Sequence, residues 1–184
     1  ANTLPKEGDN NAGAPRQRKD MAATDNAAEQ AAHIAEKIRA GKTTLGIEFG
    51  STRIKAVLID DNFQTIASGD YSWASHLEDG LWSYTTEEIW GGLQSAYASM
   101  ANDVETAYGE KLTHVGHIGF SAMMHGYLAF DEAGELLVPF RTWQNANTSE
   151  AHKKLSELFQ YNIPERWSIA HLYPVSYTHL RAHE

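Results

Sequence analysis

The chain has 184 residues, a net charge of −9 and no cysteine. A chain of this length can bury roughly 70% of its unfolded surface, which is sufficient for one globular domain. The absence of cysteine excludes disulfides and thiolate metal sites, the acidic balance argues against nucleic-acid or anionic-membrane partners, and no apolar stretch approaches the ~20 residues of a membrane span. These features predict a cytoplasmic protein.

The N-terminal residues 1–23 are polar, punctuated by glycine and proline, and without periodicity, so we predict a disordered extension there. Met21 is a candidate for the genuine start of the protein. An amphipathic helix is expected over Asn26–Ala40, where apolar residues recur on one stripe and Gly41 follows as a terminator.

The next 130 or so residues alternate between strand-like and helix-like patterns. Three strands come first, then the strongest helix with a capping box at its start, then a further strand, a hairpin and two more helices. The expected bounds are strands Thr44–Phe49, Arg53–Ile59, Thr65–Tyr71 and Val115–Ser121, hairpin strands Tyr127–Phe130 and Leu136–Phe140, and helices Thr86–Ala107, Ser149–Phe159 and Pro164–Leu172. This order predicts an α/β fold in which helices flank a mixed sheet.

The corner between the first two strands concentrates polar chemistry. Gly50 allows a ligand to approach the backbone, Ser51 and Thr52 offer hydroxyls and free N–H groups, and Glu48 can face a hydrated Mg²⁺. Such a turn could hold phosphate. The alternative, an ordinary hairpin with a polar tip, is equally compatible with these residues.

A second candidate site lies in the segment 118–147. Met124 and His125 follow a strand and precede a glycine, and a histidine in that position can donate to a ligand hydroxyl beside an adaptable methionine wall. The alternative is a core methionine with a structural histidine. Three tryptophans could stack on the apolar face of a sugar ring or equally belong to the core: Trp73, Trp82 and Trp143.

Taken together, these segments resemble the N-terminal domain of the FGGY carbohydrate kinases, within the actin-like ATPase superfamily. The family's opening pattern, I-G-I-D-x-G-T-[ST]-x-x-K, corresponds to GIEFGSTRIK at residues 46–55. Its sugar-site pattern, G-I-[SG]-G-Q-M-H-G followed by L-R-P-x-I-L-W-N-D, corresponds to GFSAMMHG at 119–126 and VPFRTWQN at 138–145. The chain looks most similar to the xylulokinase-type ketose kinases.

The resemblance implies a ribonuclease-H-like domain and ATP-dependent phosphorylation of a hydroxyl on a sugar (ketose) or polyol, with ATP and Mg²⁺ as cofactors. It implies a small-molecule substrate as the partner and allows a homodimer of the full-length protein. The residues that it implicates are Gly50, Ser51, Thr52 and Lys55 at the ATP phosphates, Glu48 at Mg²⁺, and Met124, His125, Trp82, Trp143 and Asn145 at the sugar.

The chain also departs from the family pattern. Glu48 replaces the usual aspartate, and the W-N-D-x-R motif reads WQNAN at residues 143–147, without its acid and arginine. The family's general base and most of its adenine site lie downstream of the matching segment. We therefore expect residues 24–173 to be a partial FGGY N-terminal domain, with the second domain absent and the fragment alone inactive.

Two further expectations concern the end of the chain and the class of protein. Residues 174–184 resemble a peptide translated from adapter DNA and are predicted to be an artefactual tail, the alternative being a genuine short polar tail. The alternative function is a non-kinase, actin-like ATP-binding regulatory module, which would share the first hairpin but would not need the Met-His-Gly segment.

Overall fold

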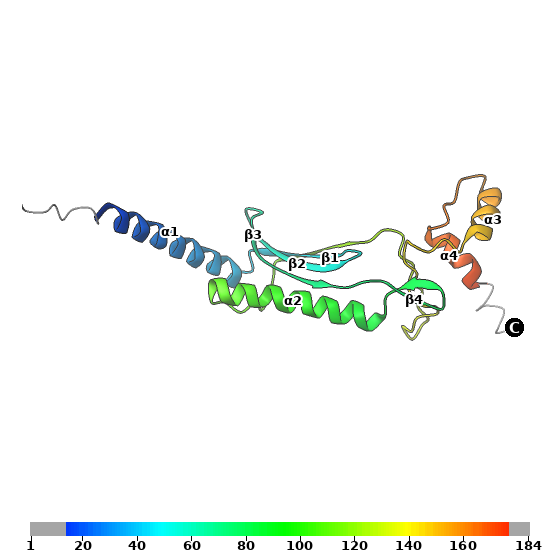
Figure 1. The fold of residues 1–184 in the computed structure, drawn as a ribbon, viewed down its shortest axis with the longest axis horizontal. Helices are drawn as coiled ribbons and strands as arrows, with labels where there is room; N and C mark the ends of the chain where they lie inside the picture. Colours follow the sequence, from blue (N-terminus) through cyan, green and yellow to red (C-terminus); the bar gives the residue numbers. More distant parts are fainter. Residues whose placement is uncertain (1–13, 177–184) are drawn as a thin grey trace, which may run out of the picture.

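The computed structural model describes residues 14–176, and the side chains of residues 24–176. Helix α1 projects from one end of an elongated molecule, a sheet backed by α2 forms the middle, and α3 and α4 lie together at the other end (Figure 1). The elements are α1 Ala14–Arg39, β1 Thr43–Phe49, β2 Arg53–Asp60, β3 Thr65–Ser72, β4 His76–Glu78, β5 Leu81–Ser83, α2 Thr86–Tyr108, β6 His117–Ala122, α3 Ser149–Phe159 and α4 Ser168–Val175.

The central sheet has the strand order β3-β2-β1-β6. The first three strands form an antiparallel meander, whereas β6 returns after α2 and pairs parallel to β1. A parallel neighbour requires such a crossover connection, which here contains α2. The predicted mixed sheet with flanking helices is therefore confirmed.

Helix α2 begins at the predicted capping box, in which the Thr85 hydroxyl accepts from Glu88 N and the Glu88 carboxylate accepts from Thr85 N. It packs along β2 and β3, where Ile54, Ala56, Leu58, Ala96, Met100 and Val104 form the buried core. Contact with β3 is so close that a Cβ added at Gly69 would lie 2.3 Å from the Met100 nitrogen. Only glycine allows this strand and helix to touch backbone to backbone.

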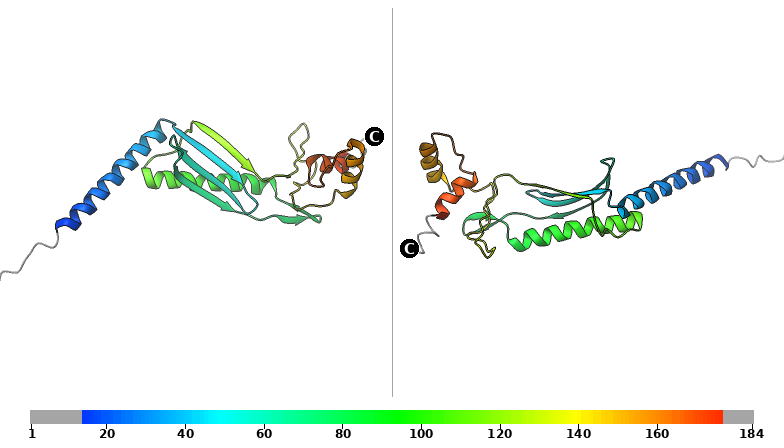
Figure 2. Two further views of the ribbon diagram at one scale, coloured as in Figure 1. Left: turned by 90° about the horizontal axis from the view of Figure 1, so that it is seen from above. Right: turned by 180° about the vertical axis from the view of Figure 1, so that it is seen from behind.

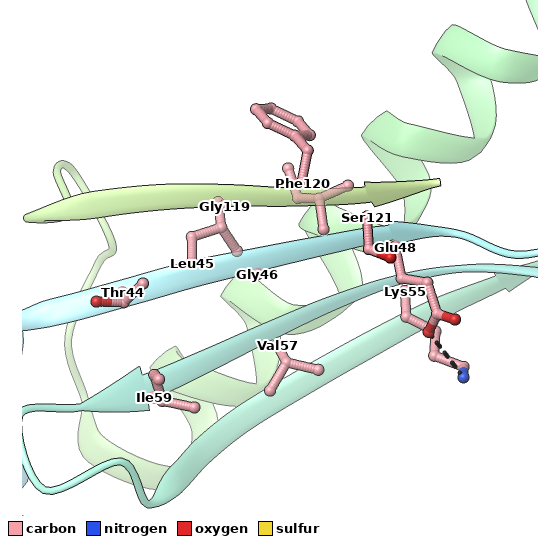
Figure 3. A pocket seen from close by; sticks show the side chains of 11 residues that line it. Thr44, Leu45, Gly46, Glu48, Lys55, Val57, Ile59, Gly119, Phe120 and Ser121 are labelled. Carbon is pink, nitrogen blue, oxygen red and sulfur yellow. Dashed lines mark hydrogen bonds and ion pairs between the residues drawn. The ribbon is translucent and has the colours of Figure 1, made fainter. Parts of the chain in front are cut away.

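The opposite face of the sheet is open, because α2 covers one face only (Figure 2). Gly46 and Gly119 are register partners in β1 and β6, and they form the floor of a shallow hollow of about 500 Å³ between the flanking side chains. Figure 3 shows Val57 and Ile59 along the hollow, with Glu48 and Lys55 at the end nearest the β1–β2 turn. Glu48 and Lys55, which flank the predicted phosphate turn at residues 50–52, therefore lie on the open face.

Several expected boundaries change. Helix α1 begins at Ala14 rather than Asn26, so residues 14–23 of the expected disordered extension are helical, while residues 1–13 lie outside the described part. The Lys37 ammonium ties this helix to the β2–β3 turn, 2.8 Å from an Asp60 oxygen and 2.6 Å from an Asp61 oxygen.

The hairpin expected at residues 127–140 is reduced to two isolated bridges, Tyr127 with Arg141 and Phe130 with Leu136. Its predicted turn is present nonetheless, because the Asp131 carboxylate accepts from the N–H groups of Ala133 and Glu135, both at 2.9 Å. At the C-terminal end, α4 includes Pro174, the first residue of the predicted tail, and residues 177–184 lie outside the described part. No described helix is both long enough and apolar enough to cross a membrane.

Candidate functional site

The turn between β1 and β2 is held by its carbonyl groups. The Gly50 carbonyl accepts from Trp73 Nε1 at 2.7 Å, the Ser51 carbonyl accepts from the Tyr84 hydroxyl at 2.8 Å, and the Thr52 carbonyl accepts from the Trp73 amide at 3.1 Å. Each of the three peptide oxygens is therefore bonded to another part of the domain. The side chains of Ser51 and Thr52 remain exposed, which leaves their hydroxyls and adjacent N–H groups for a ligand.

Trp73 and Tyr84 form the support beneath this turn. Their rings stack with centroids 4.1 Å apart, and Tyr84 also contacts Phe140 at 5.8 Å. Tyr84 is only 3% exposed, and burial raises the pKa of its phenol, which keeps it protonated as a donor. Trp73, one of the three tryptophans predicted to stack on sugar or to belong to the core, thus supports the β1–β2 turn.

Sequence reasoning missed Tyr84 altogether. Its one local signal is its position immediately before the α2 N-cap, where an apolar side chain often packs against the first turn of a helix. That signal predicts burial, but not a hydrogen bond to a turn 33 residues earlier in the chain.

Glu48 and Lys55 are register partners across the hairpin, and the Lys55 ammonium lies 3.0 Å from a Glu48 carboxylate oxygen. Both side chains are about half exposed, so each can exchange its partner for a ligand at small cost. Ser121, the β6 partner of Glu48, lies on the same face (Figure 3). The site therefore presents one carboxylate, one ammonium and hydroxyl groups within a small area.

The donor set is compatible with Mg²⁺ carried by a nucleotide. Among the described residues there is no group of three or more acidic or histidine side chains that could enclose a metal. Magnesium bound with phosphates typically uses one or two protein carboxylates and keeps several waters. The single carboxylate of Glu48, beside the turn where phosphate is predicted to bind, fits that mode of binding.

The chain leaves β6 directly beside the turn. Because β6 is parallel to β1, both strands end at the same edge of the sheet, and Met123 N donates to the Phe49 carbonyl at 3.1 Å. Beyond it, Met124 is 75% exposed, and His125 is partly exposed with a left-handed φ of 62°. The two predicted sites are thus brought together at one edge of the sheet.

Asn145 makes a closed pair of hydrogen bonds with Trp82. Its Oδ1 accepts from Trp82 N and its Nδ2 donates to Trp82 O, both at 2.8 Å, and the residue is 6% exposed. Nδ2 also donates to the Thr142 carbonyl at 3.1 Å, so the amide of Asn145 holds the backbone of Trp82 in position, and a direct contact of Asn145 with sugar stays a prediction. Trp82 and Trp143 are 37% and 46% exposed, which leaves both residues accessible for stacking.

An antiparallel three-stranded meander, a crossover helix and a parallel fourth strand, with a polar turn at the strand ends, define a ribonuclease-H-like domain of the actin-like ATPase type. The chain belongs to the FGGY family of carbohydrate kinases, because the model of the N-terminal domain of that family matches residues 43–178.

Curated relatives include a gluconokinase of Bacillus subtilis, 29% identical over 124 residues, and a xylulose kinase of Klebsiella pneumoniae, 26% identical over 113 residues. These matches cover 66% and 61% of this chain but only 23% and 22% of the relatives. The chain therefore spans less than a quarter of the length of the curated relatives that it matches.

Solved structures agree in fold. A xylulose kinase of Rhodospirillum rubrum superposes with a TM-score of 0.62 at 18% identity, covering 76% of this chain and 30% of that protein. A carbohydrate kinase of Novosphingobium aromaticivorans gives 0.53 at 16% identity, with 77% and 30% covered. At these identities the likeness concerns the fold alone.

Proposed function

We propose that this chain is the N-terminal part of an enzyme that phosphorylates a hydroxyl of a sugar, such as a ketose, or of a polyol, using ATP and Mg²⁺. The observation that carries the proposal is the hydrogen bond from Met123 N to the Phe49 carbonyl, which continues the parallel pairing of β1 and β6. This bond joins the end of β1, just before the turn, to the start of the loop that carries Met124 and His125, which supports the proposal because phosphoryl transfer requires nucleotide and sugar to be neighbours.

The residues have separate roles in this proposal. The N–H groups and hydroxyls of Ser51 and Thr52 bind phosphate oxygens, and Gly50 lets the phosphates approach the backbone. The Lys55 ammonium moves from Glu48 to the phosphates and neutralises their charge. Glu48, once released, holds the magnesium ion through its carboxylate. When bound, Mg·ATP supplies the phosphoryl group, whose bond to the β-phosphate oxygen breaks as its bond to the sugar oxygen forms.

The sugar side of the site is built from the exposed side chains. His125 donates to a sugar hydroxyl, Met124 provides an apolar wall, and the indoles of Trp82 and Trp143 stack on the apolar face of the sugar. Asn145 keeps Trp82 in position through its two backbone contacts. Names of curated relatives, gluconokinase and xylulose kinase, favour a polyhydroxylated substrate.

Removal of the hydroxyl proton requires a base that the described residues do not place at this site. Glu48 is assigned to the magnesium ion in this proposal, and Asp131 is bonded within its own turn. We therefore expect the 184-residue chain alone to form no phosphorylated product when it is incubated with Mg·ATP and each of a panel of ketoses and polyols. The reaction is measured by the release of ADP. Clear turnover would overturn the proposed need for a base from elsewhere.

Nucleotide binding can be measured without turnover. In spectra of the ¹⁵N-labelled chain, Mg·ATP should shift the amide signals of Ser51 and Thr52, and Lys55→Met should weaken binding about tenfold. Lys154→Met is the matched control, since Lys154 forms a comparable exposed pair with Glu150 at 2.7 Å on α3. Equal effects of both substitutions would contradict the phosphate site.

The sugar loop distinguishes a kinase from a regulatory module that only binds ATP. In the complete gene product, His125→Ala should weaken sugar binding while leaving Mg·ATP binding unchanged. Unchanged binding of every ketose and polyol tested, with ATP binding intact, would favour the regulatory module.

A further inference from the structure

A buried polar cluster lies beside the proposed sugar loop, formed by Tyr127, Arg141 and His171. Tyr127 and Arg141 are bridge partners that exchange two backbone hydrogen bonds, at 2.9 and 3.1 Å. His171 comes from α4, and its ring stacks on the Tyr127 ring with centroids 5.7 Å apart. The Arg141 guanidinium carbon lies 6.0 Å from the same ring, so three segments of the chain converge here.

Hydrogen-bonding atoms of this cluster lack partners among the described residues. They are Tyr127 Oη, Arg141 Nε and Nη1, and both ring nitrogens of His171. The three residues are 6%, 9% and 0% exposed. An unsatisfied buried polar group typically costs about 1–3 kcal/mol, and folded proteins leave few of them. Five such atoms in one cluster indicate a polar ligand.

The charge of the cluster specifies the kind of ligand. No carboxylate in the described part of the chain pairs with Arg141, and a guanidinium keeps its charge in proteins. Burial and the nearby Arg141 charge lower the pKa of His171 to about 4, so the imidazole is neutral near pH 7. The cluster therefore carries a single buried positive charge, which a single negative charge balances.

Geometry narrows the ligand further. The charged N–H groups of a guanidinium bind a carboxylate through charge-assisted hydrogen bonds, and Nε and Nη1 of Arg141 are both without a partner among the described residues. The Tyr127 hydroxyl and the neutral His171 ring can each donate or accept, as a hydroxyl group on the neighbouring carbon requires. In the chain, Tyr127 follows His125 by two residues and Arg141 precedes Trp143 by two. Because two residues of chain span at most about 7 Å, a sugar held by His125 and Trp143 would lie beside the backbone that carries Tyr127 and Arg141.

We propose that Arg141, with Tyr127 and His171, binds the carboxylate of an acidic sugar of the aldonate or uronate class. The inference rests on the proposed sugar kinase and specifies its substrate: the carboxylate would be held at Arg141 while a hydroxyl is presented to the phosphate turn. A neutral ketose has no carboxylate for Arg141 to bind, so with such a substrate the buried guanidinium would remain unpaired.

The experiment compares D-gluconate with D-glucitol, which has a hydroxymethyl group where D-gluconate has its carboxylate. In NMR spectra of the 184-residue chain, gluconate should shift the Arg141 Nε–H and His171 ring signals, and glucitol should bind about tenfold more weakly or not at all. Unmoved signals with gluconate, or equal shifts with glucitol, would overturn the carboxylate site.

Substitutions sharpen this comparison. Arg141→Lys keeps the charge but loses the Nε–H donor and the planar guanidinium, and it should weaken gluconate binding about tenfold. Arg53→Lys, at an exposed arginine that pairs with Asp70, is the matched control and should change nothing. If Arg141→Lys fails to fold, Tyr127→Phe removes an unpartnered hydroxyl, and it should keep the fold while weakening gluconate binding. Binding that is unaffected by Tyr127→Phe in a folded chain would contradict the proposal.

Neither ATP nor turnover enters these measurements. Failure of the carboxylate site would therefore leave the proposed phosphorylation of neutral sugars standing. Conversely, if the chain binds gluconate at Arg141 but does not bind Mg·ATP, the proposed kinase function is contradicted while the carboxylate site stands.

Discussion

Tyr84→Phe tests whether the conformation of the predicted phosphate turn, residues 50–52, depends on the hydrogen bond from the Tyr84 hydroxyl. The substitution removes only the hydroxyl that donates to the Ser51 carbonyl at 2.8 Å, and it leaves the ring stacked on Trp73. A hydrogen bond of this kind contributes about 1 kcal/mol to stability. With a urea dependence of about 2 kcal/mol per molar, the unfolding midpoint should fall by about 0.5 M at unchanged slope.

The same substitution should weaken ligand binding at the turn. Once the Ser51 carbonyl is released, its peptide can rotate, and the N–H group that follows is no longer fixed for phosphate. If the lost bond of about 1 kcal/mol must be replaced by ordering the turn on binding, the Kd for Mg·ATP rises about fivefold. The measurement is an NMR titration that follows the amide signals of Ser51 and Thr52.

Tyr108→Phe provides the matched control. Its hydroxyl donates to the Ile66 carbonyl at 2.9 Å, in the same kind of side-chain-to-backbone bond, away from the β1–β2 turn. Both variants should lose similar stability, but only Tyr84→Phe should lose affinity for Mg·ATP. Equal affinities in the two variants would refute the reasoning that the turn is preorganised by Tyr84.

Two further predictions concern stability. Hydrogen bonds from Lys37 and from nearby backbone N–H groups lower the pKa of Asp60 to about 2, against about 3.9 in the unfolded chain, so ionised Asp60 contributes at most about 2 kcal/mol. This contribution is complete above pH 4 or so and is lost as the pH falls toward about 2; urea midpoints of the natural chain and of Asp60→Asn should therefore converge at low pH, and parallel curves would argue against the pair. Gly69→Ala should destabilise the fold by about 3 kcal/mol or more, because the new Cβ would meet α2 backbone at 2.3 Å. Gly91→Ala, where a Cβ meets nothing within 4 Å, should instead stabilise it by up to about 1 kcal/mol; thermal denaturation distinguishes the two.

The sheet and the α2 cap could be predicted from the sequence because their signals are local. Alternating apolar residues determine which face of β1 and β2 is buried, and Thr85 with Glu88 marks the start of α2 through bonds three residues apart. The beginning of α1 could not be predicted in this way. Residues 14–23 favour a helix through individual propensity, yet they carry no periodic apolar stripe.

The candidate site was predictable in its residue types and not in its contacts. The sequence predicts separate roles for Glu48 at the metal and Lys55 at phosphate, whereas the hairpin register makes the two side chains partners of each other at 3.0 Å. The sequence predicts Asn145 at the sugar, but it gives no sign that the Asn145 amide is bonded to the Trp82 backbone, 63 residues away in the chain. Such long-range pairings depend on packing, for which a single sequence has no periodic signal.

The support of the phosphate turn also couples it to the start of α2. Tyr84 directly precedes Thr85, whose backbone and side chain are both fixed by Glu88 in the capping box. The hydroxyl that orients the Ser51 peptide is therefore held by the first turn of a helix that packs along β2 and β3. Loosening that helix end would release the peptide even though no residue of the turn had changed. The turn at the strand ends and the N-terminus of α2 consequently form one cooperative unit, so hydrogen exchange at the two should slow together when Mg·ATP binds.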